Sequence, residues 1–303
     1  MTPAAAGLAR RGSGREHLIE LVLFAAAGLG VVTTVGIVLV LVFETVGFFA
    51  QVSPVDYFSG TRWSASIKPY AFGVIPLVVS TLMVTLIALL VAVPLGLLAA
   101  AYLAEYASAQ VRGAVKPALE VLAGIPTIVY GFFAITVVSP LLKATVLPDL
   151  GPFSALSAGI VVGILILPLI TSLAEDAMRA VPLALREGAF AVGATRFEVA
   201  RGVVLPAALS GIMASLILAM SRAIGETMAV VLAGGTAPNL TFDPTDSVQT
   251  MTAFIVQISL GDVAQDSLQF KALFAVGMTL FVMTLALNVS SQALVAKFRN
   301  VYQ

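Results

Sequence analysis

The chain contains several apolar stretches that are longer than a soluble domain can bury. The clearest one runs from Ala71 to Ala104 without a charged residue, and as a single helix it would be about 50 Å long. A hydrocarbon core of about 30 Å needs only about 20 apolar residues in a helix. Charged residues make up 11% of the chain, whereas soluble domains carry about 25%. The sequence therefore predicts an all-α integral membrane protein.

Six transmembrane helices account for these apolar stretches. We expect them at residues 18–43, 77–102, 117–142, 154–174, 203–232 and 272–296. Pro94 lies inside the second helix, where a proline bends the backbone because it lacks an amide donor. A further apolar segment, residues 248–260, is too short to cross a bilayer. We therefore expect this segment to be an interfacial or re-entrant helix.

The first apolar stretch follows a basic tail, which is also how a secretory signal peptide begins. Arg10, Arg11 and Arg15 precede it. However, the apolar core of a signal peptide has only about 7–15 residues, and the stretch from Leu21 to Phe43 is longer than that. We therefore interpret this stretch as a retained first helix.

Basic residues are distributed unevenly between alternate loops, and this bias predicts the orientation of the chain. One side carries Arg10, Arg11, Arg15, Arg112, Lys116, Arg179, Arg186, Arg196, Arg201, Lys297 and Arg299, and the other side carries Arg62, Lys68, Lys143 and Lys271. Cytoplasmic loops of membrane proteins carry an excess of Lys and Arg. Both termini are therefore predicted to be cytoplasmic, in a multi-pass protein of the bacterial plasma (inner) membrane.

The predicted helices and orientation divide the chain into four parts. Residues 1–17 are a cytoplasmic N-terminal tail, and residues 18–70 are the first helix with a periplasmic loop. Residues 71–296 form a core of five transmembrane helices, which includes a cytoplasmic loop at 181–206. Residues 297–303 are a cytoplasmic C-terminal tail.

The loop at residues 181–206 has the sequence signals of two short helices. Pro182 suits the first position of a helix, and Gly193 ends that helix at a point where a residue that tolerates positive φ is favoured. Thr195 and Glu198 have the T-x-x-E spacing of a capping box, in which each side chain binds the backbone amide of the other residue. A helix, a glycine break and a second helix are therefore expected, with Pro206 at the return to the membrane.

The side chains of this loop favour contact with another protein. Phe190 and Phe197 are candidate apolar anchors, and the surrounding polar residues are Arg186, Glu187, Arg196, Glu198 and Arg201. The alternative is an amphipathic helix that rests on lipid headgroups, which the helix signals alone allow equally well. The spacing of the residues decides between the two interpretations.

At this loop the sequence resembles the permeases of bacterial ABC importers. Their signature, EAA-x3-G-x9-I-x-L-P, is matched by Glu187, Gly188, Ala189, Gly193, Val203, Leu205 and Pro206, with conservative departures at Gly188 and Val203. The resemblance implies a type I importer permease fold (MetI-like) in which the loop forms coupling helices. These helices would sit in a groove of a separate ATPase and pass its closure to the membrane helices, which gives alternating access.

The same resemblance implies which residues couple the chain to the ATPase. They are Arg186, Glu187, Gly188, Ala189, Phe190, Gly193, Thr195, Phe197, Leu205 and Pro206.

The sequence carries no residues for ATP hydrolysis or for other catalysis. A Walker A motif needs Lys followed by Ser or Thr, and all five lysines of the chain are followed by Pro, Ala or Phe. Cysteine is absent, and the only histidine, His17, lies in the N-terminal tail. We therefore expect no enzyme activity, no metal and no cofactor on this chain, with ATP and Mg bound by a partner ATPase.

Two charged residues lie inside the predicted fifth helix and are the candidates for a substrate path. Arg222 and Glu226 have i, i+4 spacing, which places them on one face of a helix, and Ser221 and Thr227 add hydroxyl groups beside them. Charges at membrane depth usually face a cavity or a partner. This set suits a small oxyanion. The alternative is an ion pair that only stabilises the bundle.

A second resemblance covers the chain from about Ala71 onward. GIPTIVYGFF at residues 124–133, the loop at 181–206 and the GETMAV run at 225–230 are similar to the C-type permeases of phosphate-specific (Pst) importers. This implies that Arg222 and Glu226 line a phosphate path. It also implies an A-type permease as the partner in a heterodimer, a dimer of ATP-binding subunits, and an extracytoplasmic phosphate-binding protein.

Three other functions are compatible with parts of the sequence. A secondary transporter or channel would need its own coupling-ion site and usually internal repeats, and we find no convincing repeat. A permease for sulfate, molybdate or another oxyanion is allowed by the loop signature. A membrane scaffold would leave the loop and the intramembrane charges unexplained. The neutral net charge gives no reason to expect nucleic-acid binding.

Overall fold

The computed structural model describes residues 14–65 and 67–297. Within them, six helices are long and apolar enough to cross a membrane, as the sequence predicts. These are Glu16–Phe49, Ile75–Glu105, Thr127–Thr145, Ala155–Arg179, Arg196–Ile224 and Leu268–Ala293. The prediction of an all-α membrane protein with six spans is therefore confirmed.

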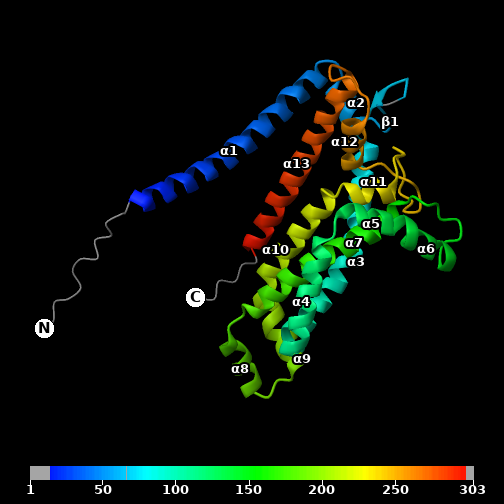
Figure 1. Cartoon of the computed structure of the whole chain (residues 1–303). Coiled ribbons are helices and arrows are strands. Elements are labelled where there is room, and N and C mark those ends of the chain that lie inside the picture. Colours follow the sequence, from blue (N-terminus) through cyan, green and yellow to red (C-terminus); the bar gives the residue numbers. More distant parts are fainter. Residues whose placement is uncertain (1–13, 66, 298–303) are drawn as a thin grey trace.

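Figure 1 shows the order of the elements along the chain. They are α1 (Gly14–Phe49), α2 (Pro54–Ser59), β1 (Trp63–Ser64), β2 (Ala71–Phe72), α3 (Ile75–Glu105), α4 (Ala109–Gly124), α5 (Thr127–Phe133), the π-helical turn η1 (Ala134–Val138), α6 (Ser139–Thr145), α7 (Ala155–Arg179), α8 (Leu183–Ala191), α9 (Arg196–Val199), the π-helical turn η2 (Ala200–Val204), α10 (Leu205–Ile224), α11 (Met228–Gly234), α12 (Met251–Leu260) and α13 (Leu268–Lys297). We call the lower end of the bundle in Figure 1 the α8 end and the upper end the α2 end.

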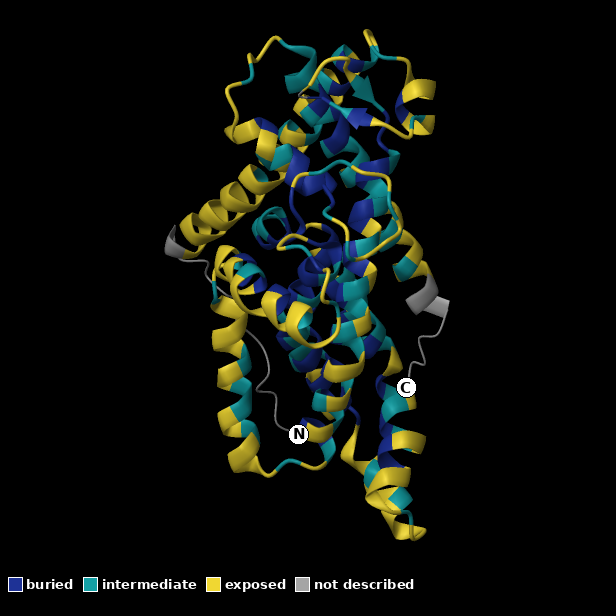
Figure 2. Cartoon of the chain, turned by 90° about the vertical axis from the view of Figure 1, so that its right-hand side faces the viewer, coloured by how far each residue is buried: buried dark blue, intermediate teal, exposed yellow. Residues whose placement is uncertain are grey.

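Helices α3 and α7 pack closely along the middle of the bundle, where Figure 2 shows most of the buried residues. Gly159 and Gly163 of α7 make this approach possible because they carry no side chain. A Cβ on Gly163 would lie 2.9 Å from the carbonyl oxygen of Ala88, and one on Gly159 would lie 2.5 Å from the Cβ of Ile87. The GxxxG spacing therefore marks a real helix contact here.

The third span begins later than the sequence analysis predicts. Residues 117–124 belong to α4, a separate helix that ends before Pro126. The residue before a proline is disfavoured in helical backbone, and Ile125 is extended, with φ −66° and ψ 130°. The membrane-spanning run is therefore Thr127–Thr145, made of α5, η1 and α6.

The predicted fifth span, residues 203–232, is wrong at both of its ends. The helix begins at Arg196 and runs through α9, η2 and α10 to Ile224. Pro206 therefore lies within a continuous helix and does not mark its start. Proline cannot donate to the backbone and crowds the carbonyl of the preceding turn. The wider turn η2, in which the Leu205 amide donates to the Ala200 carbonyl, lies directly before Pro206 and relieves this crowding.

The α2 end is held together by aromatic side chains. Trp63 of β1 pairs with Phe72 of β2 across a short antiparallel ladder, and the Trp63 ring also meets Phe254 of α12 edge to face at 4.8 Å. The Tyr57 hydroxyl lies 2.9 Å from the hydroxyl of Thr279 on α13. Helix α12, expected to be interfacial or re-entrant, is packed into this end of the bundle, with its first turn, Met251 to Phe254, buried.

Helix α1 leaves the bundle and contacts α13 near the α2 end (Figure 1). Thr45 donates a hydrogen bond of 3.2 Å to the carbonyl of Phe274. Most of the apolar side chains of α1 are exposed, for example Phe24 at 77% and Phe43 at 76%. Such a surface is suited to lipid.

We expect Gly163→Val to lower the stability of the protein by about 1–3 kcal/mol, as overpacking does. The added side chain meets the backbone of α3, and a side-chain rotation cannot relieve a clash with backbone. Thermal unfolding of the detergent-solubilised protein measures the effect. Gly30→Val on α1 is the matched control, since a Cβ there meets nothing within 4 Å. Equal melting temperatures for the two variants would contradict the close α3–α7 packing.

Candidate substrate groove and coupling surface

The residues predicted to form a substrate path do not share one helix face. Helix α10 ends at Ile224, Gly225 caps it, and α11 starts at Met228. Glu226 therefore lies in the break between two helices, and the predicted i, i+4 geometry with Arg222 is wrong. Gly225 and Thr227, which both have low helix propensity, are the local signal for this break.

Glu226 is buried, at 6% exposure, and it stabilises the break. Its Oε1 accepts a hydrogen bond of 3.4 Å from the amide of Ala229, in the first turn of α11. Its backbone carbonyl accepts a hydrogen bond of 2.8 Å from the hydroxyl of Thr252 on α12. Helix α12 is thereby connected to the break that separates α10 from α11.

The hydroxyl groups of Ser221 and Thr227 are bound to other protein groups. The Ser221 Oγ lies 2.5 Å from the Oδ1 of Asn288 on α13, and the Thr227 Oγ1 donates 3.0 Å to the carbonyl of Gly225. Of the four predicted path residues, Arg222 alone lines the groove described next.

Arg222 lines a groove of about 360 Å³ between α4, α7 and α10. The other residues that line the groove are Leu119, Glu120 and Ala123 of α4, and Leu165, Pro168, Leu169 and Ser172 of α7. Arg222 supplies a positive charge, Glu120 a carboxylate and Ser172 a hydroxyl, while the remaining lining is apolar. Such a site suits a small anion that can both accept and donate hydrogen bonds.

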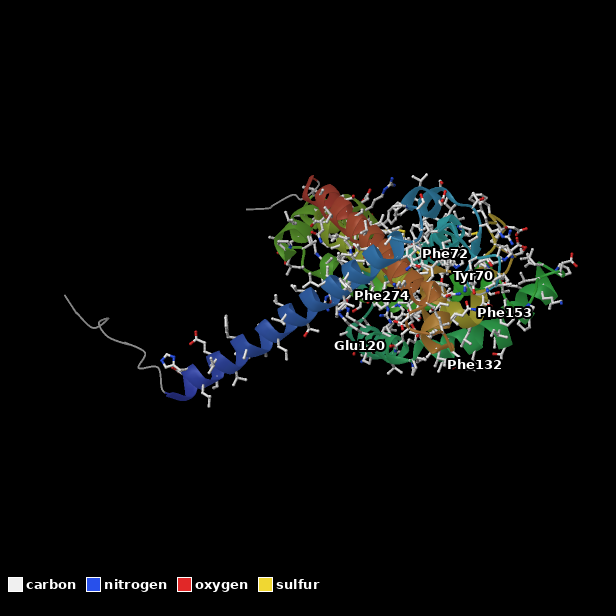
Figure 3. All side chains as sticks on the ribbon, turned by 90° about the horizontal axis from the view of Figure 1, so that it is seen from above. Tyr70, Phe72, Glu120, Phe132, Phe153 and Phe274 are labelled. Carbon is white, nitrogen blue, oxygen red and sulfur yellow. The ribbon has the colours of Figure 1, made fainter. Side chains whose placement is uncertain are left out.

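Glu120 and Ser172 are groove residues that the sequence did not predict. Glu120 lies on α4, at the same edge of the bundle as Phe132 when the molecule is viewed from above (Figure 3). The signal that could have found it is Pro126, because a helix that stops before a proline leaves residues 109–124 as a separate polar helix. Ser172 had no such signal, since a single serine in an apolar helix is common.

The loop at residues 181–206, the predicted coupling loop, forms the two helices that the sequence predicts, and it protrudes at the α8 end (Figure 1). Gly193 separates α8 from α9 with φ +89°, a value that favours glycine. The Thr195 amide donates 2.7 Å to Glu198, and the Glu198 amide donates 3.4 Å to the Thr195 hydroxyl. The predicted capping box is confirmed.

Four large apolar side chains on this protrusion are more than 40% exposed. They are Leu183 at 66%, Phe190 at 45%, Val192 at 85% and Phe197 at 62%. We call these four residues the apolar docking surface. Glu187 and Gly188 are exposed beside it, and a Cβ on Gly188 would meet nothing within 4 Å, so the Ala of the EAA signature would fit there. Ala189 and Leu205 instead pack against the core at this end.

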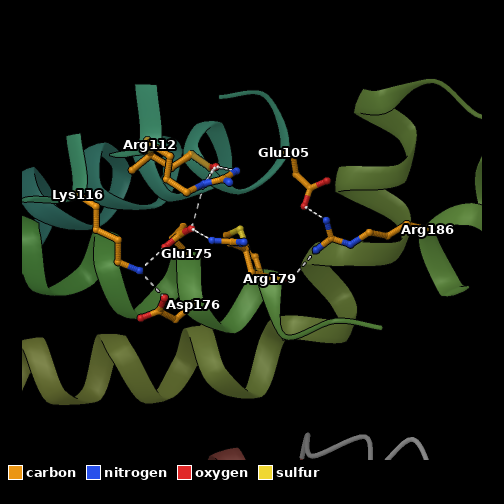
Figure 4. Close-up of polar contacts among 9 residues, drawn as sticks. Glu105, Arg112, Lys116, Glu175, Asp176, Arg179 and Arg186 are labelled. Carbon is orange, nitrogen blue, oxygen red and sulfur yellow. Dashed lines mark hydrogen bonds and ion pairs between the residues drawn. The ribbon is translucent and has the colours of Figure 1, made fainter. Parts of the chain in front are cut away.

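Arg186 points away from this surface and into the bundle, contrary to its predicted place in the polar rim (Figure 4). Its Nη1 lies 3.1 Å from the Oε1 of Glu105, the last residue of α3. Its Nη2 donates 2.7 Å to the carbonyl of Met178 in the last turn of α7. The side chains of Arg186 and Glu105 are only 15% and 9% exposed.

A second group of charges attaches α4 to α7 (Figure 4). Glu175 of α7 is 1% exposed and lies 2.8 Å from the Nζ of Lys116 and 3.5 Å from both the Nε of Arg112 and the Nη1 of Arg179. Lys116 also lies 2.6 Å from Asp176. Hydrogen bonds to Asp176 and Glu175 raise the pKa of Lys116 above its ordinary value, so the lysine stays charged at neutral pH.

Comparison with known proteins assigns the family. A family model described as the binding-protein-dependent transport system inner membrane component matches residues 92–300. The phosphate transport system permease protein PstC of Mesorhizobium japonicum is 36% identical, over 70% of each chain. The probable ABC transporter permease protein YqgH of Bacillus subtilis is 35% identical, over 77% of this chain and 75% of the relative.

Solved structures have the same fold. A chain of a bacterial ABC transporter involved in the import of the acidic polysaccharide alginate superposes with a TM-score of 0.67 at 16% identity, covering 94% of this chain and 97% of that one. A chain of the MetNI methionine transporter gives a TM-score of 0.56 at 18% identity, covering 75% and 95%. The predicted importer permease fold is confirmed. The chain belongs to the family of inner membrane components of binding-protein-dependent transport systems.

Proposed function

We propose that the chain is the C-type permease subunit of an ATP-driven importer of inorganic phosphate. The observation that carries this proposal is the groove around Arg222, in a chain about one third identical to named phosphate permeases. A guanidinium group beside a carboxylate and a hydroxyl matches the chemistry of a partly protonated oxyanion.

The polar residues of the groove support a preference for phosphate over sulfate. Arg222 attracts the negative charge, and Ser172 supplies a neutral hydrogen bond. Glu120 accepts a hydrogen bond from a phosphate hydroxyl, whereas sulfate near neutral pH has no hydroxyl and would face an unmatched carboxylate. Glu226, Ser221 and Thr227 contribute to the path by holding the break between α10 and α11, next to the end of α10 that carries Arg222.

The partners follow from the two ends of the molecule. An A-type permease completes the translocation path, and an extracytoplasmic phosphate-binding protein delivers the substrate at the α2 end. A dimer of ATP-binding subunits, which holds ATP and Mg, receives the apolar docking surface at the α8 end. In this orientation the α8 end and both termini are cytoplasmic. Aromatic side chains such as Phe190 and Phe197 are enriched in the cores of protein interfaces.

Phosphate uptake by the reconstituted transporter tests the groove. We expect Arg222→Ala to reduce uptake at least about tenfold, because a charge-assisted contact worth about 1.5–3 kcal/mol is lost. We expect Glu120→Gln to keep phosphate uptake within about tenfold and to raise the uptake of sulfate relative to phosphate.

Lys143→Ala is the control, since it removes an exposed cation of α6 that does not line the groove. Normal phosphate uptake by Arg222→Ala, in a fully assembled complex, would refute the proposed path.

Co-purification with the ATPase tests the apolar docking surface. We expect Phe197→Asp to weaken the association at least about tenfold, since an interface anchor of this size contributes more than about 1.4 kcal/mol. Phe242→Asp is the matched control, because Phe242 is a comparably exposed aromatic residue, at 80%, in the loop between α11 and α12. If both variants retained the ATPase equally, the docking role of α9 would be wrong.

A further inference from the structure

Two arginines join the ends of α3 and α7 in a crossed arrangement. Arg112 of α4 donates hydrogen bonds of 3.0 and 2.7 Å to the carbonyl of Leu103 on α3, and it lies 3.5 Å from Glu175 on α7. Arg186 of α8 does the reverse, because it binds the carbonyl of Met178 on α7 and the carboxylate of Glu105 on α3. Each arginine therefore binds a backbone carbonyl of one helix and an acid of the other.

The chemistry at helix ends explains why arginine suits both positions. The last carbonyls of a helix have no partner within the helix and carry a partial negative charge. A guanidinium group presents several donors in a fixed fork, so it can bind such a carbonyl and a carboxylate at the same time. A lysine ammonium is a compact charge without this fork, and it would serve two separated acceptors less well.

The two arginine contacts differ in how many of their buried polar atoms have a bonding partner. Glu175 is almost fully buried and has three cations around it, so the attachment of α4 to α7 is saturated. At the other contact, within the part of the chain that the structure describes, the Nε of Arg186 and the Oε1 of Glu105 are buried and make no hydrogen bond. The 3.1 Å approach of Glu105 to Arg186 is thus an ion pair without good hydrogen-bond geometry.

We infer that Arg186 is a positioning residue that connects the coupling helix α8 to the substrate groove. It joins α8 to the α3–α7 pair, and the saturated cluster at Glu175 joins that pair to α4, which forms one wall of the groove. The Arg186–Glu105 contact is the part of this connection that can rearrange, because the Nε of Arg186 and the Oε1 of Glu105 can still form hydrogen bonds. The cluster at Glu175 is the part that holds α4 on α7 in a fixed position.

The spacing along α4 supports this connection. Lys116, which binds Glu175, and Glu120, which lines the groove, are four residues apart and lie on the same side of α4. A displacement of the end of α7 is therefore carried by Lys116 to the part of α4 that holds Glu120. This inference rests on the proposed function, since it requires that α8 be moved by an ATPase.

Phosphate taken up per ATP hydrolysed, measured on the complete transporter in vesicles, tests the inference. We expect Arg186→Ala to retain the ATPase but to lower this ratio at least about fivefold, the lower end of ordinary coupling between sites. Arg186→Lys should lower it less.

Arg179→Ala is the matched control, because among the described residues Arg179 pairs with Glu175 of its own helix alone, and Arg112 and Lys116 of α4 still bind Glu175 when Arg179 is removed. An unchanged ratio in Arg186→Ala, or an equal fall in Arg179→Ala, would overturn the inference.

Hydrogen exchange on the detergent-solubilised complex gives a second measurement that needs no substrate. Amides of residues 183–191 should exchange faster in Arg186→Ala than in Arg179→Ala, and equal rates would overturn the inference. If the wild-type complex takes up no phosphate, the proposed function fails, while this measurement still decides the role of Arg186.

Discussion

The close packing of α3 against α7 is the constraint on which the rest of the structure depends. Gly159 and Gly163 let the two backbones approach, so these helices form the buried centre of the bundle. Helix α4 lies against α7, and α10 packs on both members of the pair. The groove at Arg222 is the space that remains between α4, α7 and α10. The shape of the groove therefore depends on the packing against α3, which fixes the position of α7.

Charge at the α8 end complements this apolar packing. A carboxylate as buried as Glu175 is costly to desolvate, and it is tolerated because cations from α4 and from α7 itself surround it. These contacts determine which helices lie together where the bundle meets α8. Apolar packing in the middle thus holds the bundle together, and ion pairs at the α8 end connect the bundle to the predicted coupling loop.

Local signals in the sequence predict the local features of the structure. The six apolar stretches, the positive φ of Gly193 and the capping box at Thr195 each depend on neighbouring residues, and all are found. Prediction from the sequence fails where two local rules compete, as at Pro126 and Gly225, where a break interrupts an apolar stretch. It also misses the inward direction of Arg186, because that depends on Glu105, which is distant in the sequence.

The π-helical turn η2 fixes the rotational phase between the coupling loop and the rest of its helix. It inserts one residue into an otherwise regular helix, and each residue of an α-helix advances the direction of the side chains by about 100°. The docking face at Phe197 and the groove face at Arg222 belong to one continuous helical run. The directions of Phe197 and Arg222 relative to each other therefore depend on this single extra residue. A chain shortened by one residue at η2 would present a different face of α9 to a partner protein.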